Sequence, residues 1–282
     1  MGKFDGVLLA SDFDNTLIYT EDSLRSGAPV PDLSAENRRA LEYFMGDGGR
    51  FAIATGRALA SFQGFAGAVP MNAPCVVCNG AAIYDFEKEE YIEVALLDGD
   101  VRGRVQQVLD RFPTVAVEAY HIDNVIHAVH PNAVTRHHEH ITHVAVEERA
   151  SLLEVPLPLG KLLLEGEHAV LEQARAYLAE CGWAGDYELI FSNESLLELT
   201  RRGANKGGMV LCLAEKLGIS REHVYCIGDE ANDLSMLSEA AEGFAPGNCV
   251  PVVRNSGATI VADARDGALA EVIAILDRKY GA

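Results

Sequence analysis

The chain has 282 residues, of which 49% are hydrophobic, and its formal net charge at pH 7 is −19. This length allows one large domain or two ordinary ones, each with a core. So acidic a surface repels the phosphates of nucleic acids and anionic membranes, which excludes both as expected partners. We expect a small-molecule partner instead, and a monomer or small homo-oligomer.

The sequence carries no targeting signal that we recognise. No apolar run approaches the roughly 18 residues that a membrane span needs, and no signal-type segment opens the chain. The pair Cys75 and Cys78 has the spacing of half a zinc site, but no second pair completes it. We therefore expect a cytoplasmic protein with reduced cysteines.

The first third of the chain alternates predicted strands and helices. Residues 6–10, 50–54 and 75–78 are short apolar runs typical of buried strands. Residues 15–33 are predicted to be a polar loop, and a helix is predicted to begin near Ser34. This alternation implies a parallel sheet with right-handed crossovers.

The pattern changes between about residues 81 and 199, where short β-rich segments alternate with helices. Residues 115–120 and 162–164 are typical of strands. Residues 101–112 and 169–181 have apolar side chains every three or four positions, as amphipathic helices do. The middle of the chain therefore predicts an inserted α+β domain.

The strand and helix alternation resumes near Lys206 and continues to the C-terminus. Helices are predicted at 206–217, 234–241 and 268–280, and strands at 224–227, 243–245 and 259–261. We therefore predict an α/β fold. Its Rossmann-like, doubly wound parallel-sheet core comprises residues 1–83 and 198–282, and residues 84–197 form an inserted α+β cap.

Polar motifs follow the predicted core strands. Asp12 and Asp14 come directly after the first strand, and two carboxylates so close repel each other unless a cation such as Mg²⁺ lies beside them. Thr55-Gly56-Arg57 follows the second strand, and Asp229 follows the strand at 224–227. Ligands of open α/β sheets bind at this edge, so these motifs predict a single site.

One helix start carries a further candidate. Lys206 lies in the first turn of its predicted helix, where a positive charge opposes the helix dipole, and this cost indicates a functional placement. Asn232 and Asp233 follow Asp229 closely. A carboxylate nucleophile, a second carboxyl, a lysine and a metal are sufficient for phosphoryl transfer. Each motif alone is also compatible with an ordinary turn or helix cap.

Together and in this order, the motifs resemble those of the haloacid dehalogenase superfamily, and more closely those of the Cof-type phosphatases. The resemblance covers essentially the whole chain, although the cap matches only in position and size. It implies a Mg²⁺-dependent phosphatase that hydrolyses a small phosphomonoester, such as a sugar phosphate, through an aspartyl-phosphate.

The resemblance also implies roles for individual residues. Asp12 would be the nucleophile, and Asp14 would protonate the leaving group and then activate water. Thr55, the N–H of Gly56 and Lys206 would bind the phosphoryl group, and Asn232 would reach the substrate or its phosphate. The Mg²⁺ ligands would come from four residues, namely Asp12, the backbone carbonyl of Asp14, Asp229 and the supporting Asp233.

Three features depart from the family pattern or stand outside it. Asn15 replaces a frequent glycine, which we expect to be harmless because Asn tolerates unusual turn conformations. Glu230 adds a negative charge beside Asp229. Seven of the nine histidines lie between His121 and His143. A metal site there is conceivable, but a polar cap surface is the favoured interpretation.

Two other functions use much of the same chemistry. A phosphotransferase or mutase would pass the phosphoryl group from Asp12 to a second substrate. A receiver-like switch would keep the aspartyl-phosphate without turnover. The large insert and the position of Asp14 disfavour the switch, because a receiver needs neither a cap nor an acid/base group.

Overall fold

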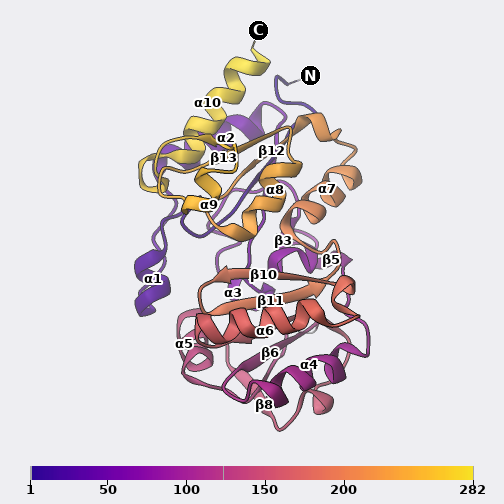
Figure 1. Cartoon of the computed structure of the whole chain (residues 1–282). Helices are drawn as coiled ribbons and strands as arrows, with labels where there is room; N and C mark the ends of the chain where they lie inside the picture. Colours follow the sequence, from indigo (N-terminus) through magenta and orange to yellow (C-terminus); the bar gives the residue numbers. More distant parts are fainter. Residues whose placement is uncertain (1, 123, 282) are drawn as a thin grey trace.

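The computed structural model describes residues 2–122 and 124–281. They form two parts, one above the other in Figure 1, and the lower part is inserted between segments of the upper one. The upper part in Figure 1 contains a parallel sheet in the order β14-β13-β12-β1-β2. Its strands are β1 (Leu8–Ser11), β2 (Arg50–Ile53), β12 (Val224–Ile227), β13 (Glu242–Ala245) and β14 (Thr259–Ile260).

Helices cover both faces of this sheet. Leu9 of β1 packs in one apolar cluster with residues of the helices on one face, while Leu8 and Ala10 pack in a second cluster on the other face. The α/β doubly wound prediction is therefore confirmed. The core helices are α2 (Ala35–Gly46), α3 (Leu59–Phe62), α7 (Lys206–Lys216), α8 (Leu234–Glu239), α9 (Pro251–Arg254) and α10 (Ala268–Tyr280).

The prediction of a loop over residues 15–33 is wrong at α1 (Glu21–Ser26). Two acidic residues occupy its first turn, where their negative charge interacts favourably with the positive end of the helix dipole. Arg25 also forms an ion pair with Asp22 at 2.7 Å. Gly27 ends the helix with a φ of 70°. So short a helix has no apolar repeat, and the sequence pattern therefore did not reveal it.

The third predicted strand leads out of the parallel sheet. β3 (Cys75–Val77) touches the sheet through one parallel bridge between Ala54 and Val76. It then pairs antiparallel with β4 (Ala82–Asp85), which pairs with β5 (Glu90–Val94). The predicted start of the cap, between residues 83 and 84, falls inside β4. Its predicted end, between residues 197 and 198, falls inside a strand of the cap sheet, β11 (Leu196–Arg201). The proposed boundaries stay a prediction.

The lower part of Figure 1 is built on a six-stranded sheet in the order β10-β11-β9-β6-β7-β8. The pairs are antiparallel except for β7 with β8. Its strands are β6 (Ala116–His121), β7 (Ile126–Val129), β8 (Val146–Arg149), β9 (Leu159–Glu165), β10 (Tyr187–Asn193) and β11 (Leu196–Arg201). Its helices are α4 (Val101–Arg111), α5 (Ala133–Thr142) and α6 (His168–Glu180).

The two faces of the cap sheet differ in character. Val117 and Ala119 of β6 pack with apolar residues of α4 and α6, whereas successive side chains of a strand point to opposite faces. The opposite face therefore carries Glu118 and Tyr120. Buried charged residues of the neighbouring strands share this face, namely Lys161 and Glu165 of β9 and Glu198 of β11. We call it the polar face of the cap sheet.

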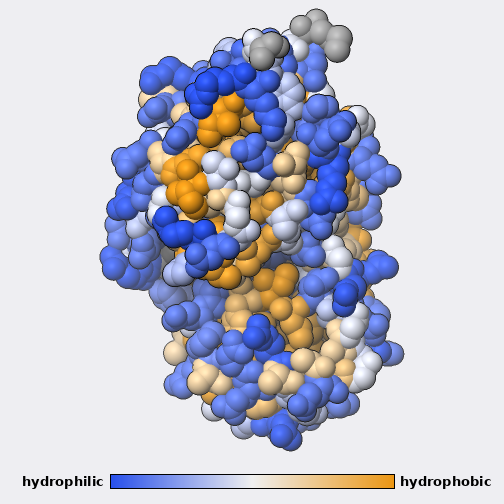
Figure 2. Space-filling model, turned by 45° about the horizontal axis from the view of Figure 1, so that its top comes forward, coloured by the Kyte–Doolittle hydropathy of each residue, from blue (hydrophilic) through white to orange (hydrophobic). Residues whose placement is uncertain are grey.

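Hydrophilic residues cover most of the surface seen in Figure 2, as the net charge of −19 predicts. Apolar residues are visible at the waist, where the surface is hollowed between the two parts. Within the described ranges, none of the helices has the length and hydropathy needed to cross a bilayer.

Candidate active site

The predicted site lies at the carboxyl ends of the parallel strands. Asp12 directly follows β1, and its backbone N–H donates to the carbonyl of Ile227, the last residue of β12, at 2.9 Å. Asp229 follows β12 by two residues. Since β1 and β12 are neighbours in the sheet, both carboxylates reach the same edge, and both are buried.

Lys206 joins this edge from the first turn of α7. Its Nζ lies 2.6 Å from Asp12 Oδ1 and 2.6 Å from Asp233 Oδ1, and its side chain is only 1% exposed. Burial lowers the pKa of Lys206, but the two carboxylates outweigh burial and raise it. The lysine is therefore charged, and it balances part of the negative charge that the fold collects here.

The carboxylates of Asp12, Asp229 and Asp233 each place an oxygen within 4.8 Å of the others. Burial raises the pKa of Asp12 to about 7 against the opposing effect of Lys206. Burial and the neighbouring Asp12 and Asp233 also raise the pKa of Asp229. A divalent cation with a preference for oxygen would relieve this repulsion, so the three residues fit Mg²⁺.

Asp14 has a different environment from Asp12. Its carboxylate accepts two hydrogen bonds from Arg57, one from Nε at 2.8 Å and one from Nη2 at 2.7 Å. Thr20 donates a third at 2.7 Å. Asn15, the residue after Asp14, has a φ of 55°, and its side-chain oxygen accepts a hydrogen bond from the Thr20 N–H at 3.0 Å. The Asn in place of glycine thus supports the turn.

The Thr55-Gly56 segment approaches the site from β2. Thr55 is buried, and its hydroxyl accepts a hydrogen bond from the Arg57 N–H at 3.1 Å. A Cβ on Gly56 would lie 3.0 Å from the side-chain nitrogen of Asn79, so only glycine fits without displacing that side chain. The backbone of this segment is therefore held tightly against Asn79.

Asn232 is tied to the same neighbour. Its side-chain nitrogen donates to Asn79 Oδ1 at 2.8 Å, while its own side-chain oxygen is buried and forms no hydrogen bond within the described part of the chain. Glu230 lies beside it as the cap of a short 3₁₀ turn, with its carboxylate accepting from the Ala231 N–H. This hydrogen bond therefore holds the Glu230 carboxylate against the backbone of the turn.

Sequence reasoning missed a polar chain that links core and cap. Asn79 donates to Glu198 Oε1 at 2.5 Å, and Glu198 pairs with Lys161 at 3.0 Å. Lys161 Nζ also lies 3.5 Å from the Gly56 carbonyl and 4.4 Å from the centre of the Tyr120 ring. The signals in the sequence that could have revealed this chain were two charged residues inside apolar runs, Lys161 and Glu198.

A cavity lies between core and cap next to Lys161. It is a shallow space that is partly open to solvent. Leu59 and Cys78 line it from the core, and Tyr91, Tyr120 and Lys161 line it from the cap side. Because Lys161 also reaches the Gly56 carbonyl, the cavity adjoins the predicted phosphoryl-binding segment.

The whole pattern matches a known family. Residues 9–273 match the family model described as haloacid dehalogenase-like hydrolase, and the chain belongs to this family. Among solved structures, it resembles a haloacid dehalogenase-like hydrolase from Bacteroides thetaiotaomicron, with 24% identity, a TM-score of 0.77, and coverage of 96% of this chain and 99% of that one. The chain is a Cof-type phosphatase of this family, as the motifs predicted.

Curated relatives of similar length are also phosphatases. The 5-amino-6-(5-phospho-D-ribitylamino)uracil phosphatase YcsE of Bacillus subtilis is 25% identical over 249 residues, covering 88% of this chain and 87% of its own. The pyridoxal phosphate phosphatase YbhA of Escherichia coli is 24% identical over 277 residues, covering 94% and 97%. Their named substrates differ, so the similarity does not select one.

Proposed function

We propose that the protein is a Mg²⁺-dependent phosphatase that hydrolyses a small phosphomonoester through an aspartyl-phosphate on Asp12. The observation that carries this proposal is the buried Lys206, which bridges Asp12 and Asp233 at the strand ends. A bare pair of carboxylates would be a poor phosphate site, whereas a lysine and a divalent cation make it attractive to a phosphoryl group.

Asp12 is the proposed nucleophile because one oxygen is fixed by Lys206, which leaves the other able to attack phosphorus. The new bond joins Asp12 to phosphorus, and the bond from phosphorus to the leaving oxygen breaks. Thr55, the N–H of Gly56 and Lys206 are the proposed partners of the phosphoryl oxygens. Asn232, with its unbonded side-chain oxygen, is proposed to contact the substrate.

Asp14 is the proposed acid and base. It would give a proton to the leaving oxygen in the first step and take one from water in the second. Arg57 and Thr20 hold its carboxylate with three hydrogen bonds, which fixes the direction in which it faces. Arg57 is therefore a proposed positioning residue, because it acts through Asp14.

Asp12, Asp229 and the backbone carbonyl of Asp14 are the proposed holders of Mg²⁺. Asp233 is proposed to support them, because its carboxylate accepts a hydrogen bond from the Asp229 N–H at 2.9 Å. When bound, the ion would neutralise charge on the phosphoryl group. Thr16 supports this set, because its hydroxyl donates to Asp229 Oδ1 at 2.6 Å. This hydrogen bond orients the Asp229 carboxylate, so that its other oxygen would be available to the ion.

A small phosphorylated metabolite such as a sugar phosphate is the proposed substrate class. The cavity adjoining the Gly56 segment lies where a leaving group would extend from the phosphoryl group, and Lys161 lines it. The named relatives act on phosphorylated metabolites, which supports the class. The cap, proposed at residues 84–197 between core segments 1–83 and 198–282, would close over this group and exclude water.

Transfer to a second substrate remains the alternative reaction. The same aspartyl-phosphate would then react with an acceptor hydroxyl rather than water. Product analysis with sugar acceptors separates the two, because a transferase yields a new phosphate ester and a hydrolase yields inorganic phosphate. A receiver-like switch would show no steady turnover of a generic phosphate ester.

Rapid-quench kinetics test the proposed division of labour. With an ester that has a good leaving group, Asp14→Asn should release about one leaving group per site in a burst and then turn over slowly. Asp12→Asn should give neither burst nor turnover, because an amide is a poor nucleophile. A burst in Asp12→Asn would identify another nucleophile and refute the mechanism.

A further inference from the structure

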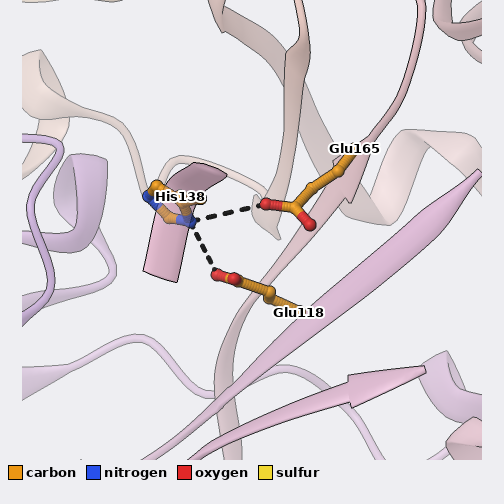
Figure 3. A group of neighbouring side chains, drawn as sticks. All are labelled: Glu118, His138 and Glu165. Atoms are coloured by element: carbon orange, nitrogen blue, oxygen red, sulfur yellow. Dashed lines mark hydrogen bonds and ion pairs between the residues drawn. The ribbon is translucent and has the colours of Figure 1, made fainter. Parts of the chain in front are cut away.

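A second cluster of charged side chains lies inside the cap. Glu118 of β6, His138 of α5 and Glu165 of β9 point toward one another (Figure 3). The Nδ1 atom of His138 lies 3.0 Å from Glu118 Oε2 and 3.4 Å from Glu165 Oε1. The two glutamate side chains are 1% and 0% exposed, and that of His138 is 17% exposed.

The hydrogen bonds of this cluster do not balance. A protonated Nδ1 has one N–H, which can serve only one of the two carboxylates. Tyr120 donates to Glu118 Oε2 at 2.6 Å, and Thr135 donates to Glu165 Oε2. Glu165 Oε1 is fully buried, faces the imidazole and forms no hydrogen bond with the described residues. An unbonded carboxylate oxygen at such a place is costly.

We propose that Glu118, His138 and Glu165 form a binding site for one divalent transition-metal ion, with Zn²⁺ as the best match. Imidazole nitrogen together with carboxylate oxygen is a ligand set typical of zinc, whereas Mg²⁺ prefers oxygen alone. Ligands at about 2.0–2.1 Å from a tetrahedral ion are about 3.3 Å apart, close to the observed 3.0 Å and 3.4 Å.

The ion would also satisfy the charge and the unbonded oxygen. Burial lowers the pKa of His138, but the two glutamates outweigh burial and raise it to about 9, so Zn²⁺ would release a proton from the imidazole. Two carboxylates and the neutral imidazole then carry two negative charges, which a divalent ion cancels. The three candidate ligand atoms already lie within 4.8 Å of one another, so the site needs little rearrangement. Tyr120 would orient Glu118 from outside the ligand set, as hydrogen-bonded groups around metal ligands commonly do.

This site shares no residue with the group at Asp12, Asp229 and Asp233. Its role would be structural, because it joins α5 to two strands of the cap sheet. The C-terminal turn of α5 contacts the core beside α1. There His140 lies so close to Gly27 that a Cβ added to Gly27 would be 2.7 Å from the imidazole ring. Bound zinc would therefore stiffen the helix through which the cap touches α1.

The expected polar surface for the histidine-rich stretch is correct for exposed His137 and His140. It is wrong for His127, which is buried, and for His138, which turns inward. The partners of His138 lie on strands, at Glu118, 20 residues before it, and at Glu165, 27 residues after it, and no local spacing rule reveals them.

Isothermal titration calorimetry with Zn²⁺ tests the site in the full-length protein. The protein is first freed of metals with a chelator and then saturated with Mg²⁺, which occupies the acidic site. We expect one Zn²⁺ per chain. Binding should weaken roughly a hundredfold or more in His138→Ala and at least about tenfold in Glu165→Gln. It should survive in His137→Ala, the neighbouring exposed histidine, and in Asp229→Asn, which impairs the acidic site.

Thermal unfolding gives an independent readout. Zn²⁺ should raise the melting temperature of the wild type and of His137→Ala by similar amounts, and it should raise that of Glu165→Gln clearly less. Glu165→Gln keeps the shape of the side chain, so this variant still tests the proposal if His138→Ala does not fold. Absence of Zn²⁺ binding by the wild type, or its loss in Asp229→Asn with retention in Glu165→Gln, would overturn the proposal.

Discussion

The environment of Lys206 predicts that Lys206→Met strongly destabilises the protein when Mg²⁺ is removed. Nζ lies 2.6 Å from one oxygen each of Asp12 and Asp233, and the side chain is 1% exposed. The substitution leaves these carboxylates buried without their cation. Breaking a buried ion pair in this way costs about 3–5 kcal/mol. At the size of this chain, the melting temperature should fall by roughly 6–20 °C.

Thermal unfolding in a chelator, followed by far-ultraviolet circular dichroism, measures this loss. Lys216→Met is the matched control, because Lys216 lies on the same helix and pairs with Glu93 at the surface. Exposed ion pairs contribute at most about 1 kcal/mol. Mg²⁺ should stabilise Lys206→Met more than the wild type. Melting of Lys206→Met within about 2 °C of Lys216→Met would refute the reasoning.

Two further substitutions probe the site from other directions. Arg57→Lys keeps the charge but loses the paired hydrogen bonds to Asp14, so kcat should fall roughly tenfold, as expected when one charge-assisted hydrogen bond is lost, with little change in KM. Steady-state kinetics check this, and an unchanged kcat would show that Arg57 does not position Asp14. Gly80→Ala should lower the free energy of unfolding by more than about 1 kcal/mol in urea, because Gly80 has a φ of 96° and a Cβ would lie 2.3 Å from the Asn205 carbonyl. Gly257→Ala has a similar φ of 94° without neighbours, and an equal loss there would mean that the contact with Asn205 does not matter.

The candidate site was predictable because its residues occupy fixed positions relative to core strands. Asp12 and Asp229 each follow an apolar run, and parallel strands end at a common edge, so a linear pattern implies that they meet. Lys206 was identifiable by its unfavourable place at a helix start. The predicted helix at residues 268–280 matches α10 because a long apolar repeat and a following glycine define it.

The partners of these residues were not predictable. The contact of Arg57 with Asp14 depends on how two loops fold over the sheet edge, and no spacing rule describes it. Lys161 and Glu198 meet because β9 pairs with β11 in the cap sheet, and Asn79 joins them only where the cap lies on the core. The order of the cap strands was likewise hidden, because antiparallel strands of similar composition can pair in many registers.

The strand order of the core has a consequence for how the chain is made. β1 pairs on one side with β2, which is synthesised soon after it, and on the other side with β12, which leaves the ribosome roughly 200 residues later. At about 5–20 residues per second, β1 waits on the order of 10–40 s for that neighbour. During this time one edge of the nascent sheet lies open, with Leu8 and Ala10 uncovered on the face that α7 later protects. The cap is fully synthesised within the same interval, so it can fold before the core is complete.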